Sequence, residues 1–371
     1  MCQRFKMKGN DSRLYDICRR AERGEDITIG FLGGSITQGS LSSKPETCYA
    51  YLVYDWFVKR FPKAKVHYVN AGIGGTTSYF GVARMGEDLM MYRPDFVVID
   101  FSVNDDAEAF FEETYEGVIR RLMFADFEPA VLALNNVFYD TGVSAEEFHS
   151  RVTDAYGIGH VNIKNTLYRR ISSGEMQREE ISPDGLHPND KGHALIAGDV
   201  TDYIADWMDR VEKNGDKVEE INVCAVTPNR FEATVRYDIS NTGDTNGRMT
   251  VQTDGFTVDT AEKKGHLDLW KRGWIGQKEG DRISFTFYGR TLGIQYRKSV
   301  RKPVPIAQCI VDDDTANPLE LDGNFTEDWG DCLYLQSVLV EDVPKLHTVT
   351  IEIKKAENTV EDFYLNSLLI S

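Results

Sequence analysis

The feature that most constrains this chain is a change in the rhythm of its apolar residues near position 215. Up to residue 213, strand-sized apolar runs alternate with helix-sized amphipathic stretches. This alternation predicts βαβ units, and therefore a parallel sheet covered by helices on both faces. Beyond the polar stretch 211–220, the apolar segments become short and alternating, with turn residues between them. That second pattern predicts an antiparallel β-sandwich or jelly roll.

We therefore predict two domains, an α/β domain over residues 1–213 and an all-β domain over residues 216–371. A length of 371 residues is sufficient for a hydrophobic core in each. In the first domain, the amphipathic stretches predict helices over 49–61, 81–91, 112–124 and 193–210. In the second, we expect separate strands within 231–239, 248–258, 281–289, 291–298, 306–312, 347–355 and 363–371.

The composition excludes several classes of partner. The chain has 42 Lys+Arg against 59 Asp+Glu, a formal net charge of −17 that is spread over both domains. Such acidity repels nucleic acids and anionic lipid surfaces, so we expect neither as a partner. No apolar run is long enough for a membrane span, and the first residues have no apolar leader, which favours a cytoplasmic protein. The six cysteines are scattered without a C-x-x-C pair, so we expect free thiols.

Ser35 follows a buried-strand pattern and a Gly-Gly pair in the segment DITIGFLGGSITQGS. In an open parallel sheet, ligands bind at the carboxyl ends of the strands, so this serine lies where a nucleophile would be placed. The two glycines allow a substrate to approach the backbone closely. A simple glycine turn, in which Ser35 caps local N–H groups, explains this segment equally well when it is taken alone.

Two further strand ends carry hydrogen-bond donors. The segment VNAGIGGTT has three glycines in four residues, and their N–H groups suit an oxyanion hole as well as a tight turn. No G-x-x-x-x-G-K-[ST] motif is present, so phosphate binding is disfavoured. Asn104 comes after a third apolar run, where its amide can donate to developing negative charge or start a turn.

Asp184 and His187 lie three residues apart in the loop segment SPDGLHPNDKGH. At this spacing the carboxylate can accept from the imidazole N–H and fix its tautomer, leaving the other nitrogen as a base for Ser35. The chain has no H-E-x-x-H pair, so we expect no metal and no cofactor. We assign packing or capping to His193, near a predicted helix start, and structural roles to the histidines without a nearby companion: His67, His149, His160, His266 and His347.

Together, the four segments resemble the SGNH (GDSL-type) hydrolase superfamily, whose blocks contribute Ser, Gly, Asn and His in this order. The resemblance covers about residues 26–210 and implies a flavodoxin-like three-layer domain. It also implies Ser35 as nucleophile, His187 as general base and Asp184 as its orienting partner. The implied oxyanion donors are the Ser35 and Gly75 N–H groups and the Asn104 side chain, with Gly74 as an alternative to Gly75. The first block reads Gly-Gly-Ser where the family usually has Gly-Asp-Ser, and Ser102 stands where glycine is usual.

With its predicted β-sandwich and the segment LDGNFTEDWGD at 321–331, the chain is similar to the two-domain acetyl-xylan esterases of this superfamily, which end in a jelly roll. The resemblance implies a serine esterase that removes acetyl groups from carbohydrate, with xylo-oligosaccharides as the expected substrate and a homo-oligomer as the expected assembly. Two alternatives stay open, a short-chain esterase or thioesterase for metabolites and a non-catalytic carbohydrate-binding protein. Trp329, in a polar loop, is a candidate for stacking on a sugar face. Burial against another domain or subunit is the competing interpretation, and the one we favour for Trp270 and Trp274.

Overall fold

The computed structural model describes residues 4–6, 8–215, 220–222, 224–243 and 249–371. The chain divides into two compact units, Met1–Glu232 and Ala233–Ser371. The first is the expected α/β domain and the second is all-β, so the predicted fold class is confirmed.

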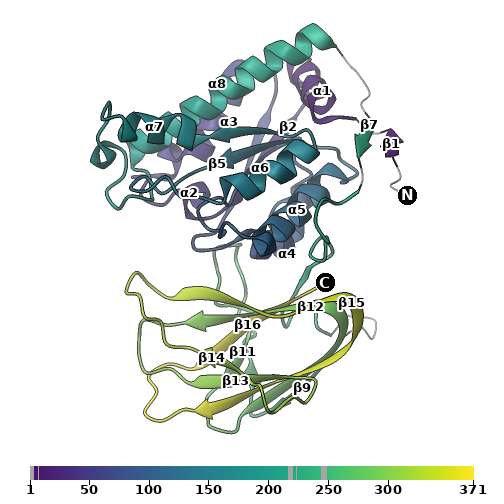
Figure 1. Ribbon diagram of the computed structural model, residues 1–371, viewed down its shortest axis with the longest axis vertical. Helices are drawn as coiled ribbons and strands as arrows, with labels where there is room; N and C mark the ends of the chain where they lie inside the picture. The colour runs from purple at the N-terminus through teal and green to yellow at the C-terminus, as the bar shows by residue number, and fades with distance from the viewer. Residues whose placement is uncertain (1–3, 7, 216–219, 223, 244–248) are drawn as a thin grey trace. The chain divides into compact units, whose positions relative to one another are not determined.

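A parallel sheet forms the centre of the first unit (Figure 1). Its strand order is β3-β2-β4-β5-β6, which is the flavodoxin-like order when the strands are numbered along this domain. The strands are β2 (Ile27–Gly33), β3 (Val66–Gly72), β4 (Phe96–Asp100), β5 (Ala130–Asn135) and β6 (Gly159–Asn162). A small antiparallel pair, β1 (Arg4–Lys6) with β7 (Glu220–Asn222), lies outside this sheet.

Helices cover both faces of the parallel sheet (Figure 1). One face carries α1 (Asn10–Glu22), α3 (Tyr49–Arg60) and α8 (Asp190–Asn214). The other carries α4 (Ser78–Asp88), α5 (Ala109–Met123) and α6 (Glu146–Ala155). The shorter helices are α2 (Ser35–Gln38), α7 (Leu167–Ser172), η1 (Pro45–Thr47), η2 (Met90–Tyr92), η3 (Ile163–Asn165) and η4 (Arg178–Glu180).

The core of this unit follows from the alternation of side chains along the strands. Every second residue of β2, namely Ile27, Ile29 and Phe31, is buried against the face that α1, α3 and α8 cover. The predicted helices α4, α5 and α8 each begin three residues earlier than expected, and at α4 and α8 a polar group caps the start. The side chain of Asn189 accepts from the Gly192 N–H at the start of α8, and a carboxylate from another loop accepts from Ser78 at the start of α4.

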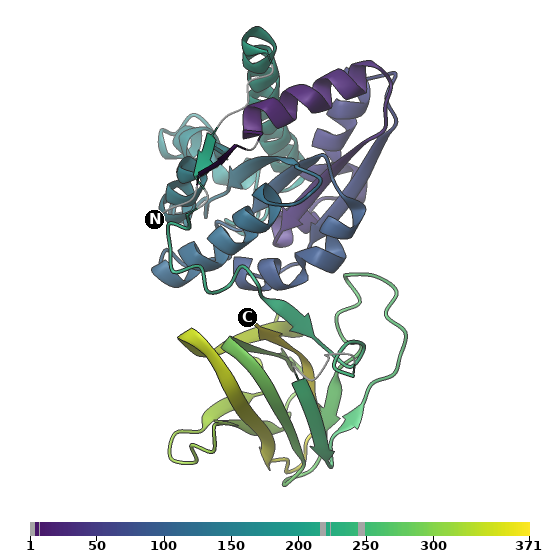
Figure 2. The same cartoon turned by 90° about the vertical axis from the view of Figure 1, so that its right-hand side faces the viewer.

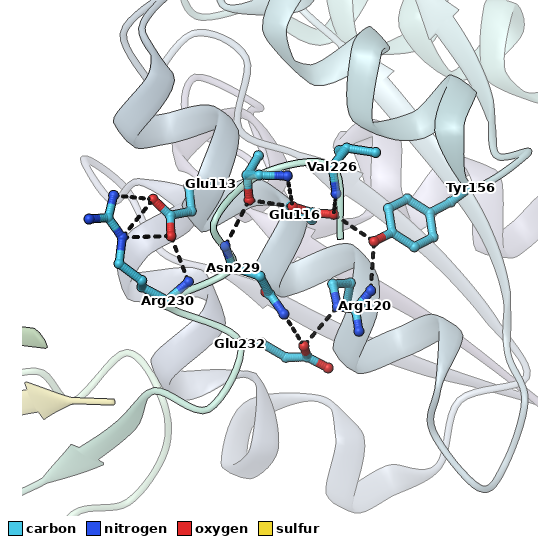
Figure 3. Close-up of polar contacts among 9 residues, drawn as sticks. Glu113, Glu116, Arg120, Tyr156, Val226, Asn229, Arg230 and Glu232 are labelled. Carbon is cyan, nitrogen blue, oxygen red and sulfur yellow. Dashed lines mark hydrogen bonds and ion pairs between the residues drawn. The ribbon is translucent and has the colours of Figure 1, made fainter. Parts of the chain in front are cut away.

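The segment that leaves the first unit is bound along α5 by two buried carboxylates (Figure 3). Glu116 accepts from the N–H groups of Val226 and Thr227 at 2.7 and 2.8 Å. Glu113 accepts from the backbone N–H of Arg230 at 2.6 Å and from its guanidinium. These contacts extend the first unit to Glu232, beyond the predicted domain limit at residue 213.

The second unit is built from antiparallel strands (Figure 2). The path of paired strands runs β10-β11-β16-β12-β15-β13-β14, with β8 beside β16 and β9 beside β12. The bounds are β8 (Val235–Tyr237), β9 (Met249–Asp254), β10 (Thr257–Val258), β11 (Trp274–Gly276), β12 (Arg282–Lys298), β13 (Ile306–Val311), β14 (Leu319–Asp322), β15 (Cys332–Lys355) and β16 (Phe363–Ile370).

The strands predicted over 281–289 and 291–298 are one long strand, β12. Its first part pairs with β9, and its last part pairs with β16. The register shifts between Gly289 and Thr291, so the expected turn is instead a bulge at which the strand changes its partner. Trp274 is buried in the core of this same unit, which corrects the expectation that it packs against another domain or subunit.

Cys18, Cys48, Cys309 and Cys332 are free thiols, whereas Cys224 is disulfide-bonded. The expectation of free thiols is therefore wrong for Cys224, because spacing along a sequence does not show which distant segments meet. Cys2 lies outside the described residues. Within the part of the chain that the structure describes, no helix is both long and apolar enough to cross a membrane.

Candidate active site

The direction of the strand order reverses between β2 and β4, the point at which open α/β sheets bind their ligands. The two strands end together, and the Gly34 N–H donates to the Asp100 carbonyl at 3.2 Å. Ser35 is separated from the end of β2 by one residue, Gly34, and Asn104 lies in the turn after β4. The sheet thus brings these two predicted site residues to one edge.

Ser35 is the first residue of the short helix α2 and is nearly buried. N–H groups in the first turn of a helix have no partner within that helix, which leaves the Ser35 N–H available to an external acceptor. Its hydroxyl lies 2.8 Å from Nε2 of His187, a hydrogen-bond distance across 152 positions of the sequence. The serine therefore has a base within reach.

His187 is oriented by Asp184, as its Nδ1 lies 2.7 Å from the Asp184 carboxylate. Burial by itself raises the pKa of Asp184, but hydrogen bonds from the His187 side chain and from the Leu186 and His187 N–H groups outweigh it and lower the pKa to about 2. A carboxylate that is charged at neutral pH, placed at Nδ1, favours the tautomer in which Nε2 is an acceptor. That is the nitrogen that faces the Ser35 hydroxyl.

The loop that carries Asp184 and His187 is fixed by the segment after β5. The Tyr139 N–H donates to the Gly185 carbonyl at 2.7 Å. Gly185 has φ +80°, and a Cβ at this position would lie 2.1 Å from a carboxylate oxygen of Asp140. A glycine is therefore required for the loop to approach that segment.

The glycine turn after β3 contains the two candidate oxyanion donors, the N–H groups of Gly74 and Gly75, and they differ in their hydrogen bonding. The Gly74 N–H donates to the side chain of Gln38, on α2, at 2.6 Å. The hydrogen bonds of the described residues include none from the Gly75 N–H, which lies at an exposed residue with φ +67°. Of the two alternatives that the sequence leaves open, this geometry favours Gly75 as an oxyanion donor.

The Asn104 side chain lies against Gly34, the residue before the nucleophile candidate. A Cβ at Gly34 would lie 2.1 Å from Oδ1 and 3.2 Å from Nδ2 of Asn104. Gly34 therefore makes room for the amide beside Ser35. The Gly-Gly pair before Ser35 has a steric purpose that its sequence alone does not reveal.

Sequence reasoning missed two buried groups that support this edge of the sheet. Arg84, on α4, donates to the carbonyls of Ala71 and Gly33 at 2.7 and 3.1 Å and so holds the ends of β3 and β2 together. Asp100, at the end of β4, accepts from Thr37 and Asn136 at 3.1 Å each. No local motif marks these residues, because each interacts with partners far away in the sequence.

His149 and His347 have no companion nearby in the sequence, but each has an acidic partner in the structure. His149 lies 3.0 Å from the Asp105 carboxylate, and His347 lies 2.9 Å from that of Asp312. Both partners are distant in sequence, so a search for nearby residues could not find them. His193, for which packing or capping was expected, lies in α8 and binds the start of another helix, α3, because its Nδ1 accepts from the Tyr49 N–H at 3.2 Å.

Of the aromatic candidates in the second unit, Trp329 is 61% exposed. Its ring meets that of Phe325 edge to face, with the centroids 4.9 Å apart. Trp270 contacts the Tyr364 ring of its own unit, with the centroids 6.3 Å apart. Of Trp270, Trp274 and Trp329, Trp329 is therefore the most exposed to solvent.

A serine hydroxyl, an imidazole and hydrogen-bond donors meet at the switch point of a flavodoxin-like sheet, an arrangement that suits a hydrolase. Residues 31–195 match the GDSL-like lipase/acylhydrolase family. The chain is also similar to a two-domain esterase active on acetylated mannans, with 44% identity and a TM-score of 0.90. That match covers 97% of this chain and 95% of the other. The chain belongs to the GDSL-like lipase/acylhydrolase family and is a carboxylic-ester hydrolase.

Two other relatives are similar to this chain. A crystal structure of a two-domain esterase active on acetylated mannans, co-crystallized with mannopentaose, is 43% identical with a TM-score of 0.90, covering 99% of this chain and 96% of that one. Thioesterase 1/protease 1/lysophospholipase L1 of Escherichia coli (strain K12) is 24% identical over 190 residues, 49% of this chain and 81% of that protein. The expected resemblance to two-domain carbohydrate esterases is thereby confirmed.

Proposed function

We propose that this protein removes O-acetyl groups from oligosaccharides of the mannan type by a Ser–His–Asp acyl-enzyme mechanism. The observation that carries the proposal is the continuous hydrogen-bonded series from the Asp184 carboxylate through His187 to the Ser35 hydroxyl. It lies at the edge of the sheet that also presents Asn104 and the glycine turn. This is the set of groups that acyl transfer requires.

The reaction begins when Ser35 Oγ attacks the acetyl carbonyl and Nε2 of His187 accepts its proton. The N–H groups of Ser35 and Gly75 and the amide of Asn104 donate to the oxyanion of the tetrahedral intermediate. The C–O bond to the sugar then breaks, and His187 returns the proton to the leaving sugar hydroxyl. Water activated by His187 attacks the acetyl-Ser35 ester, which releases acetate and restores the free hydroxyl.

The choice of mannan over xylan rests on the solved structures that match both units of the chain. The similar two-domain esterase is active on acetylated mannans, and the second was co-crystallized with mannopentaose. The resemblance found in the sequence favoured xylo-oligosaccharides, whereas these two solved structures, which match 97% and 99% of the chain, favour mannans. A neutral sugar backbone is compatible with the net charge of −17, whereas an acidic polysaccharide would be repelled.

Trp329 is the substrate-binding candidate of the second unit. An exposed indole braced edge-on by Phe325 presents a flat apolar surface, the shape that stacks on a sugar ring. We include glycan binding through Trp329 in the proposal. Replacing Trp329 with Ala is expected to weaken binding of mannopentaose measured by titration calorimetry, with hydrolysis of 4-nitrophenyl acetate unchanged.

The test of the proposed function is acetate release from acetylated manno-oligosaccharides and xylo-oligosaccharides, measured side by side. We expect faster release from the manno-oligosaccharides and no release by Ser35→Ala above background. Ser172→Ala, at an exposed serine of α7, is the matched control and should retain full activity. Undiminished turnover by Ser35→Ala would overturn the mechanism, and faster hydrolysis of acyl thioesters than of sugar acetates would overturn the substrate class.

A further inference from the structure

A fully buried acid–histidine pair lies behind the glycine turn and Asn104, outside the Ser35 series. The side chains of Asp105 and His149 are both 0% exposed, and Nε2 of His149 lies 3.0 Å from a carboxylate oxygen of Asp105. The Tyr115 ring stacks on the imidazole with centroids 3.7 Å apart and planes 5° from parallel. Within the described residues Nδ1 of His149 has no hydrogen-bond partner, so the ring's polar contact is with Asp105.

The second oxygen of Asp105 binds the start of helix α4. It accepts from the Ser78 N–H at 2.8 Å. The N-cap residue of α4, Thr77, makes no side-chain capping bond, so Asp105 supplies the negative group that a helix N-terminus favours. Ser78 also meets α5, because its hydroxyl lies 2.6 Å from that of Thr114.

The contact between Asp105 and Ser78 connects the two loops that carry the candidate oxyanion donors. Asp105 directly follows Asn104, and the backbone N–H groups of both donate to the Phe101 carbonyl at 2.9 Å. Ser78 lies three residues after Gly75, directly beyond the glycine turn. One carboxylate therefore joins the loop of the Asn104 amide to the loop of the Gly75 N–H.

His149 holds that carboxylate from a third element. It lies on α6, which packs beside α5, as α5 does beside α4 (Figure 1). The loop before α6 is in turn joined to the turn after β4, since the Ala145 N–H donates to the Ser102 carbonyl at 2.7 Å. A buried carboxylate with a partner on each oxygen cannot rotate without losing a hydrogen bond, which is costly in the interior.

We propose that Asp105 and His149 are positioning residues that set the distance between the Asn104 and Gly75 donors of the oxyanion hole. The proposal rests on the proposed ester hydrolysis. Donors are effective only where they meet the oxyanion, and displacement by about 1 Å can reduce a rate by about 100-fold. Loss of the pair should therefore lower kcat while leaving KM nearly unchanged.

The test uses hydrolysis of 4-nitrophenyl acetate together with inhibition by phenylboronic acid, whose adduct with Ser35 is tetrahedral. His149→Phe keeps a ring beside Tyr115 but removes the hydrogen bond to Asp105. We expect kcat to fall by about 10- to 100-fold, KM to stay within about twofold, and the boronic acid to bind correspondingly more weakly. His149→Gln places an amide N–H near the position of Nε2 and should restore most of the activity.

The matched control is His347→Phe in the second unit. His347 is also buried, hydrogen-bonded to an aspartate and stacked on an aromatic ring, Phe287. This variant should lower the melting temperature without changing kcat. If His149→Phe, or Asp105→Ala where the first variant does not fold, shows normal kcat and boronic acid affinity, the positioning role is overturned. Retention of full activity by Ser35→Ala would instead refute the proposed function.

Discussion

The Ser35 hydroxyl lies 2.8 Å from Nε2 of His187, although 152 residues separate them in the sequence. Ser35 is placed by the end of β2 and the start of α2, whereas His187 belongs to the loop that precedes α8. Their meeting depends on the sheet order and on the packing of the loop that Gly185 allows. Substitutions at the separate elements that place Ser35 and His187 therefore give independent tests of the catalytic mechanism.

Replacing Asp184 with Asn should lower kcat for 4-nitrophenyl acetate on the order of 10³- to 10⁴-fold, because an amide no longer favours the tautomer that leaves Nε2 free. KM should change little. Glu179→Gln, at an exposed acid nearby in the chain, is the control and should behave as the wild type. Normal turnover by Asp184→Asn would exclude Asp184 as the orienting group.

Gly34→Ala should displace the Asn104 amide, since the new Cβ would lie 2.1 Å from its Oδ1. Loss of one oxyanion donor typically costs about 100- to 1000-fold in kcat. Gly198→Ala, on α8, adds a methyl group with nothing within 4 Å and is the matched control. Equal kcat values for the two variants would show that Asn104 does not act beside Ser35.

The raised pKa of Asp100 predicts that the free energy of unfolding depends on pH. Burial raises its pKa to about 7, against the opposing hydrogen bonds from Asn136 and Thr37. Between about pH 4 and pH 7 the folded state then holds a proton that the unfolded state has lost, so the free energy of unfolding falls as the pH rises, by up to about 1.4 kcal/mol per unit. Asp100→Asn should remove this slope.

Urea unfolding of the wild type and of Asp100→Asn at pH 4.5, 6 and 7.5 measures the effect. The difference in free energy of unfolding should shift in favour of the variant as the pH increases. A difference that stays constant over this range would contradict a raised pKa at Asp100.

Glu116→Gln should loosen the segment bound along α5. The carboxylate accepts from Val226, Thr227 and Tyr156, and an amide would turn an N–H group toward one of these donors. We expect a loss of about 1–3 kcal/mol in the free energy of unfolding and faster proteolysis within residues 224–232. Glu112→Gln, one turn earlier on the same helix, should have a much smaller effect, and equal effects would argue against this binding role.

The type of each domain and the pairing of Asp184 with His187 follow from local patterns in the sequence. The periods of 3.6 and 2 in the apolar residues predicted an α/β domain followed by an all-β domain. The three-residue spacing of Asp184 and His187 predicted their hydrogen bond, because a loop of that length keeps the two side chains together. Such features are encoded over a few consecutive residues, and they are therefore readable without a structure.

Other features depend on contacts between distant segments. The use of the Gly74 N–H by Gln38, the pairing of His149 with Asp105, and the binding of residues 224–232 by α5 have no local signal. The continuity of β12 was also missed, because a glycine bulge resembles a turn when its neighbouring strands are unknown.

The sequence by itself determined the type of each domain and the chemical groups of the site, since periodicity and short motifs are local properties. Only the tertiary structure decided that the Gly75 N–H, and not the Gly74 N–H, remains available beside Ser35. It also decided that the buried Asp105 joins the loops of Gly75 and Asn104. The physical reason is that a buried polar group must find a hydrogen-bond partner, and packing rather than sequence distance determines which partner it meets.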